Sequence, residues 1–161
     1  EEACTTHLPR ILDATAVWCQ LFSEPEAGSD LAALHTTATR IDDAYVINGQ
    51  KVWTSFAQHS AYGLLLARTG PLEDRHRGLS LFVLPIDAPG VTVRPLREIT
   101  GGTHFNELFL DDVVLPADRL LGEEGGGWAA AMFTLGNERN LGGTDEIQRN
   151  IIAERILGLP R

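Results

Sequence analysis

The chain has 161 residues, of which 43% are hydrophobic and 22% are charged, as is usual for a globular domain. Its formal net charge of −9 and its pI near 4.9 exclude general binding to nucleic acids or anionic membranes, because both need a basic face. No apolar run approaches the roughly 18 residues of a membrane span. The N-terminus resembles no signal or transit peptide, and we expect the chain to be cut from a longer protein.

Cys4 and Cys19 form neither a metal-ligand spacing nor a disulfide framework, so both are expected to be free thiols in a reducing compartment. The histidines are scattered, and no metal site is expected. Ser29-Asp30 with His35 could suggest a hydrolase, but the glycines two residues either side of a nucleophilic serine are absent.

A short helix is expected over residues 5–13, with Pro9 in its first turn. Short apolar runs separated by turn residues then follow over residues 17–122, which predicts a mainly β domain, a barrel or a sandwich. The expected strands are Val17–Phe22, Thr36–Ile41, Tyr62–Ala67, Leu79–Pro85, Val91–Arg94 and Phe105–Leu110.

The connections are expected from their turn residues. Asp42-Asp43 and Pro89-Gly90 predict turns, and the polar stretch from Thr69 to Gly78 predicts an exposed loop. Asn48-Gly49 lies between Tyr45–Ile47 and Lys51–Ser55, and this pattern predicts a β-hairpin.

The segment Trp18–Asp30 predicts a strand that leads into a ligand-binding loop. Pro25 and Gly28 end the strand, and Gly28 would allow a close backbone approach. Ser23, Ser29 and the free amides of the loop could bind a polar ligand.

Residues 123–161 are expected to form two helices. The first covers Trp128–Asn140. The second begins at Thr144, which can cap it, and its isoleucines form one apolar face that needs a partner.

Four separated motifs together resemble the acyl-CoA dehydrogenase family, over about Leu8 to Arg161. They are Trp18–Asp30, Asn48–Ser55, Phe105-Asn106-Glu107 with Asp111-Asp112-Val113, and Gly143–Arg149. The resemblance implies a middle β domain that forms one wall of an FAD site, with short helices at both ends.

The resemblance also implies roles for individual residues. Phe22 and Ser23 would contact the isoalloxazine ring, with the Ser23 hydroxyl on its pyrimidine side. Trp53 would pack near the flavin beside Thr54, and the Ser55 hydroxyl would reach N5, which receives the hydride. From the residues alone, a packed tryptophan at an ordinary strand end is the favoured interpretation of this segment, and the resemblance shifts the balance towards the flavin contact.

Gly28 and Ser29 would face the flavin pyrophosphate and the acyl-CoA tail, and Thr144 would meet the FAD. The family reaction converts an acyl-CoA thioester to its trans-2-enoyl form, with a glutamate taking the α-proton. Glu138 matches one family placement of this base, with Arg139 beside it to position the substrate. The alternative interpretation of Glu138 is a solvated carboxylate at a helix end.

The family has an N-terminal helical domain before the position of Leu8 and further helices between the positions of Asn140 and Leu141. We therefore expect an internal deletion near 140–141 and impaired turnover, because a site open to water gains little from oriented dipoles. A non-catalytic flavin- or acyl-CoA-binding module and an inactive structural remnant stay open as alternatives.

The resemblance implies an acyl-CoA substrate, electron-transfer flavoprotein as the electron acceptor, and a homodimer or homotetramer. The expected location is the cytoplasm or, in a eukaryote, the mitochondrial matrix.

Overall fold

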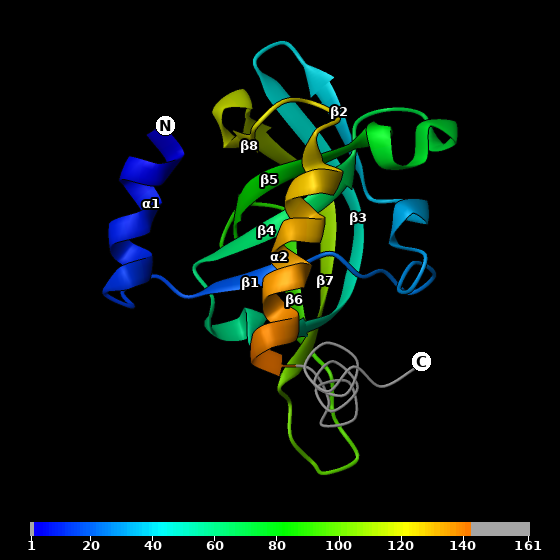
Figure 1. Cartoon of the computed structure of the whole chain (residues 1–161). Coiled ribbons are helices and arrows are strands. Elements are labelled where there is room, and N and C mark those ends of the chain that lie inside the picture. Colours follow the sequence, from blue (N-terminus) through cyan, green and yellow to red (C-terminus); the bar gives the residue numbers. More distant parts are fainter. Residues whose placement is uncertain (1, 143–161) are drawn as a thin grey trace, which may run out of the picture. The chain divides into compact units, whose positions relative to one another are not determined.

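The computed structural model describes the backbone of residues 2–142 and the side chains of residues 5–137. The chain forms two units, Glu1–Trp128 and Ala129–Arg161. The first unit contains the helix α1, Glu2–Leu12, and an eight-stranded sheet (Figure 1). The helix α2, Gly127–Gly142, begins at the end of the first unit.

The sheet has the hydrogen-bonded order β6-β7-β3-β2-β4-β5-β8, and β1 pairs with β4 outside this path. Its neighbours are antiparallel except for β1 with β4 and one pair of residues between β2 and β4. The strands are β1 Trp18–Leu21, β2 Thr37–Ile41, β3 Ala44–Ser55, β4 Tyr62–Arg68, β5 Leu79–Pro85, β6 Val91–Pro95, β7 Phe105–Pro116 and β8 Leu120–Leu121.

The sheet curves around one apolar core. Tyr45 of β3 meets Phe82 of β5 edge to face, with ring centroids 4.9 Å apart, although β2 and β4 separate these strands in the sheet. Strands β1 to β5 and β7 all contribute buried side chains to this core. The prediction of a mainly β fold with short helices at both ends is therefore confirmed.

Helix α1 begins earlier than the sequence indicates, so Pro9 lies in its interior and not in its first turn. His7 of α1 packs edge-on against Trp18 and Tyr62, with ring centroids 5.1 and 4.9 Å away. No helix in the described part of the chain is long and apolar enough to cross a membrane.

Cys19 is a free, buried thiol, as expected, and burial raises its pKa to about 11. It is therefore an inert core residue at neutral pH. Cys4 lies outside the described side chains.

The predicted hairpin at Asn48-Gly49 is wrong. β3 runs through both residues, and the tight turn lies at Asp42-Asp43, where it joins β2 to β3. Asn48 is held by β7, because its side-chain amide donates to the Asp112 carboxylate at 3.0 Å and its side-chain oxygen accepts from the Asp112 amide at 2.9 Å. The pairing with β7 shifts register between Ile47 and Gly49, where Asp111 and Asp112 of β7 lie opposite the single residue Asn48, so the bulge at this point is in β7.

Glycine is required at position 49, opposite the β7 bulge, because Thr36 lies directly against it. A Cβ at Gly49 would lie 2.4 Å from the Thr36 Oγ1 and 2.7 Å from its Cα. We expect Gly49→Ala to lower the free energy of unfolding by about 1–3 kcal/mol through this clash, measured by urea denaturation.

Gly28→Ala is the matched control for Gly49→Ala. A Cβ at Gly28 would meet no atom within 4 Å, so this substitution should leave stability unchanged or raise it by up to about 1 kcal/mol. Equal stability changes at the two glycines would contradict the assignment of the clash.

The other connections follow the expectations more closely. The turn at Pro89-Gly90 is present, with Gly90 at φ 87°. The stretch 69–78 is mostly exposed and contains the 3-10 helix η3, Leu72–Gly78. The remaining 3-10 helices are η1 Leu31–Ala33, η2 Ala57–His59 and η4 Ala117–Arg119.

The first of the two predicted C-terminal helices is present as α2. The predicted helix beginning at Thr144 lies outside the described residues.

Candidate functional site

The loop that follows β1 carries the first group of candidate residues. Phe22 is buried, Ser23 is half-buried, and Gly28 and Ser29 are exposed. Glu24 and Ala27 exchange two backbone hydrogen bonds, of 3.0 and 3.2 Å, which close a tight turn before the exposed tip. A Cβ at Gly28 would meet no atom within 4 Å, so no described part of the chain makes the close backbone approach that was expected at this glycine.

The second group lies at the end of β3, where this strand carries a bulge at Val52-Trp53. Its register against β7 shifts between Lys51 and Thr54, and Trp53 takes a left-handed backbone conformation with φ 61°. This conformation is strained for a bulky residue, and it turns the Trp53 ring outward, 64% exposed. Burial then alternates, so Thr54 is buried while Trp53 and Ser55 share the solvent side.

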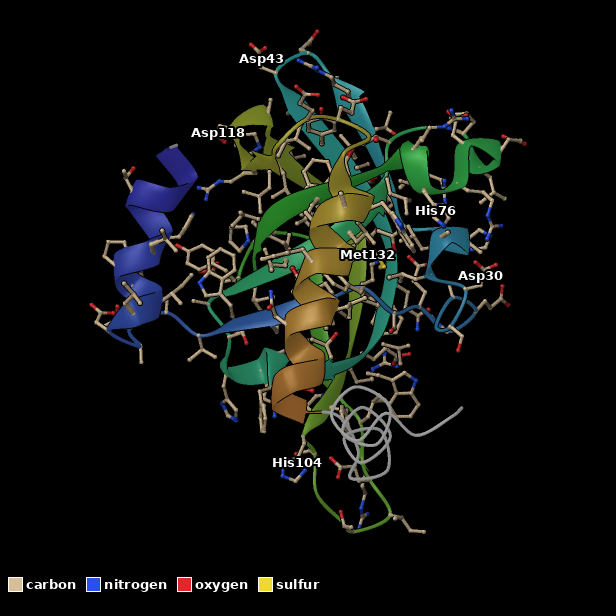
Figure 2. All side chains as sticks on the ribbon, in the orientation of Figure 1. Asp30, Asp43, His76, His104, Asp118 and Met132 are labelled. Atoms are coloured by element: carbon tan, nitrogen blue, oxygen red, sulfur yellow. The ribbon has the colours of Figure 1, made fainter. Side chains whose placement is uncertain are left out.

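The rings of Trp53 and Phe105 form an aromatic face at this end of the sheet, and the ring of Phe56, which follows Ser55, is also exposed. The Trp53 and Phe105 rings meet edge to face, with centroids 6.0 Å apart, and Ser55 pairs with Phe105 in the sheet. All three rings are at least one third exposed. His104, labelled in Figure 2, packs against Phe56 at the border of this face. The exposed Trp53 ring is suited to contact a planar ring ligand.

The two groups are joined directly. The backbone amide of Val52 donates to the Ser23 carbonyl at 2.9 Å, which sets Ser23 beside the residue that precedes Trp53. The loop after β1 and the bulge of β3 therefore form one continuous surface.

Asn106 fixes the backbone of the bulge from β7. It is fully buried, and its side-chain amide donates to the Thr54 carbonyl at 3.1 Å and to the side-chain oxygen of Gln58. The Thr54 hydroxyl is itself buried and has no hydrogen-bond partner among the described residues. Thr54 thus turns its side chain away from the aromatic face.

A buried ion pair lies beneath the loop. The Lys51 ammonium, fully buried, donates to the Glu24 carboxylate at 2.9 Å and to the Phe22 carbonyl at 3.0 Å. The same carboxylate accepts the backbone amides of His35 at 2.6 Å and Thr36 at 2.9 Å. Besides the bond that joins them, these two side chains therefore bind the backbone at both ends of one loop.

The pKa values of the pair reflect its burial. Burial lowers the pKa of Lys51 to about 8, although the Glu24 charge opposes that shift. For Glu24, burial alone would raise the pKa, but the Lys51 charge and the hydrogen bonds from Thr36 and His35 outweigh it, so the pKa is lowered. Both groups are charged at neutral pH.

Arg68 holds the later part of the same loop. It is buried at the end of β4 and donates to the carbonyls of Leu34 at 3.0 Å and Ala32 at 2.6 Å. On the exposed side, Arg75 pairs with the carboxylate of Asp30 at 2.6 Å, at the loop tip labelled in Figure 2.

The structure thus brings together one set of the predicted site residues and leaves another outside it. The Val52–Ser23 hydrogen bond places Ser23 next to the bulge that exposes Trp53 and Ser55, while Phe22 is buried and Gly28 and Ser29 lie at the exposed tip of the same loop. Glu138 and Arg139 belong to α2, but their side chains, and all of Thr144, lie outside the described residues.

Glu24, Lys51 and Asn106 lie within the family motifs, but no role in the site was predicted for them. A signal for Lys51 was available: it lies at an inward position of a strand, directly before the bulge, and a buried lysine needs a carboxylate partner. No local pattern identified Glu24 as that partner, because 27 positions separate the two residues.

Residues 19–113, which carry the loop, the bulge and the aromatic face, match the family model "Acyl-CoA dehydrogenase, middle domain". The chain belongs to the acyl-CoA dehydrogenase family. Its sequence is 50% identical to acyl-CoA dehydrogenase IpdE1 of Mycobacterium tuberculosis over 150 residues, which cover 93% of this chain and 38% of that relative.

Solved structures of acyl-CoA dehydrogenases and related flavoproteins share the fold. The acyl-CoA dehydrogenase from Geobacillus kaustophilus matches with a TM-score of 0.81 and 37% identity, over 86% of this chain and 37% of that one. A structure described as an FAD-dependent dehydrogenase matches with a TM-score of 0.75 and 30% identity, over 80% of this chain and 35% of that one. The chain therefore spans less than half the length of these family members.

Proposed function

We propose that this chain provides the flavin-facing wall of an FAD-dependent acyl-CoA dehydrogenase, which converts an acyl-CoA thioester to its trans-2-enoyl form. The observation that carries the proposal is the Trp53 ring, held outward by a left-handed backbone at φ 61° and 64% exposed. Strain and apolar exposure at one residue both cost free energy, and a bound ring would offset that cost. Residues 17–122 would form the binding domain.

The chemistry of the surface fits FAD. The exposed Trp53 ring offers an apolar plane for the isoalloxazine ring, and the half-buried Ser23 and exposed Ser55 would place hydroxyls beside it. Phe22 would support the ring contact from the buried side. The Thr54 side chain is buried, so Thr54 would contribute through its backbone. When bound, FAD would accept the hydride from the β-carbon of the substrate.

The exposed loop tip would bind the pyrophosphate of FAD and the tail of the acyl-CoA. Gly28 and Ser29 would face the pyrophosphate of FAD, with Ser29 also within reach of the acyl-CoA tail. This local binding is needed because the net charge of −9 gives no general attraction for anions. Thr144 would add a contact to FAD from the C-terminal segment.

Glu138 would take the α-proton of the thioester, and Arg139 would position the substrate beside it. A water-poor site would raise the proton affinity of the carboxylate towards that of an effective base. The acceptor of the electrons would be electron-transfer flavoprotein, and the working enzyme would be a homo-oligomer.

The proton abstraction is tested by Glu138→Gln, introduced in this chain and at the matching position of a full-length relative. Anaerobic addition of an acyl-CoA to the FAD-loaded proteins should bleach the flavin, and the substitution should slow bleaching by about 10²- to 10⁴-fold. FAD affinity should stay within about twofold, because the glutamine keeps the size of the side chain.

Asn137→Ala is the neighbouring control, since its side-chain amide donates to the carbonyl of Phe133 within the same helix. Its flavin should still bleach at the original rate. Undiminished bleaching in the Glu138→Gln relative would assign proton abstraction to another residue. FAD uptake by this chain without bleaching would make the chain a binding module and not a complete enzyme.

A further inference from the structure

The loop that carries Ser23 and Ser29 is fixed at both ends by one buried pair. Lys51 binds the carbonyl of Phe22, where the loop leaves β1, and Glu24 binds the amides of His35 and Thr36, where the loop enters β2. The direct 2.9 Å contact between the Lys51 ammonium and the Glu24 carboxylate links the two ends of the loop to each other. The loop therefore cannot move at either end without breaking a charge-assisted hydrogen bond.

The same pair is connected to the strained bulge through the backbone of β3. Lys51 lies two residues before Trp53 on β3, and Val52, between them, donates its amide to the Ser23 carbonyl. A shift of Lys51 would thus move both the Ser23 hydroxyl and the Trp53 ring. These are two of the side chains that the proposed function places against the isoalloxazine.

Stability alone does not account for this arrangement. Removing two charges from water costs several kcal/mol each, and an apolar pair of similar volume is often as stable or more stable. The lowered pKa of Lys51, about 8, reflects that burial cost. The hydrogen bonds of the pair, in contrast, are directional and go to the loop ends, which an apolar pair could not hold.

We propose that Glu24 and Lys51 are positioning residues, which hold the loop after β1 against the β3 bulge in the geometry that binds FAD. This inference rests on the proposed FAD site. It adds two residues that touch no part of the ligand and that act through Ser23 and Trp53.

The double variant Glu24→Gln/Lys51→Met tests the role apart from folding, because it removes both charges together and keeps the side-chain volumes. Its thermal unfolding should stay cooperative, but titration with FAD, followed by flavin fluorescence, should show a dissociation constant raised roughly 10- to 100-fold. Arg75→Gln is the matched control, since it breaks the exposed pair with Asp30 on the same loop. The FAD affinity of this control should match the wild type.

Amide hydrogen exchange on the wild type gives a second test that needs no variant. If Glu24 and Lys51 hold the loop in place without FAD, the amides of His35, Thr36 and Val52 are protected from exchange before FAD is added. Addition of FAD should then change their protection by less than about threefold. In the double variant, the His35 and Thr36 amides should lose protection while the amides of β4 and β5 keep theirs.

Three results distinguish the positioning role of Glu24 and Lys51 from the proposed FAD site. A folded double variant with wild-type FAD affinity overturns the positioning role. Wild-type amides at His35 and Thr36 that become protected only on FAD binding overturn it as well, whether or not the variant folds. A wild-type chain that takes up no FAD defeats the proposed function, and exchange at these amides then reports on the loop alone.

Discussion

Lys51→Met alone should lower the free energy of unfolding by about 3–5 kcal/mol, the largest stability effect expected for a single substitution in this sheet. The methionine fills the space of the lysine stem but leaves the Glu24 carboxylate, 7% exposed, without its cation. The carboxylate keeps the His35 and Thr36 amides, which are not enough to offset a buried negative charge. Urea denaturation near pH 7 measures the change.

A second substitution distinguishes loss of a charge partner from loss of packing. Adding Glu24→Gln to Lys51→Met should recover most of the lost stability, because no unpaired charge remains. Arg75→Gln, which removes an ion pair whose partners are both more than half exposed, should change stability by less than about 1 kcal/mol. A Lys51→Met variant as stable as the Arg75→Gln variant would show that the buried pair has no structural role.

Trp53→Gly should weaken FAD binding by roughly 10- to 100-fold while leaving the free energy of unfolding within about 1 kcal/mol of the wild type. Stacking of an aromatic side chain on a planar base contributes about 1–3 kcal/mol, which sets the expected loss of affinity. Glycine adopts the left-handed conformation found at φ 61° without strain, and this offsets the lost contact with Phe105. Isothermal titration with FAD and urea denaturation measure the two quantities.

Ile41→Ala is the control for loss of an exposed apolar side chain. Ile41 is 53% exposed and ends β2 beside the Asp42-Asp43 turn, and Figure 2 shows Asp43 at the opposite end of the sheet from His104. This variant should bind FAD as the wild type does. Equal FAD affinity in the Trp53→Gly and Ile41→Ala variants would remove Trp53 from the binding surface.

The positions of most strands along the chain were predictable from the sequence, because short apolar runs and turn residues act locally. The turns at Asp42-Asp43 and Pro89-Gly90 are present where the sequence places them. The pairing of β1 with β4 was not predictable, since it joins segments more than 40 positions apart and depends on the whole sheet. The hairpin prediction at Asn48-Gly49 failed for the same reason, because contacts with the distant residues Asp112 and Thr36 outweigh the local turn preference of Asn-Gly.

The candidate site was only partly predictable, and the limit is physical. A motif marks residues that we propose to face a ligand, such as Ser23 and Trp53, but it carries no information on what holds them. The conformation of Trp53 depends on register against β7, and the loop depends on Lys51 meeting Glu24 in the interior. Such contacts arise between distant segments, so only the folded sheet shows them.

Saturable FAD uptake by the purified chain is the most direct test of the central claim, that the loop after β1 and the Trp53 bulge form a flavin-binding surface. After incubation with FAD and gel filtration, the chain should elute with a flavin absorbance band shifted from that of free FAD. Its tryptophan fluorescence should be quenched in proportion to the bound flavin, and the Trp53→Gly variant should lose both signals. A chain that elutes colourless, with tryptophan fluorescence unchanged at saturating FAD, would contradict the account.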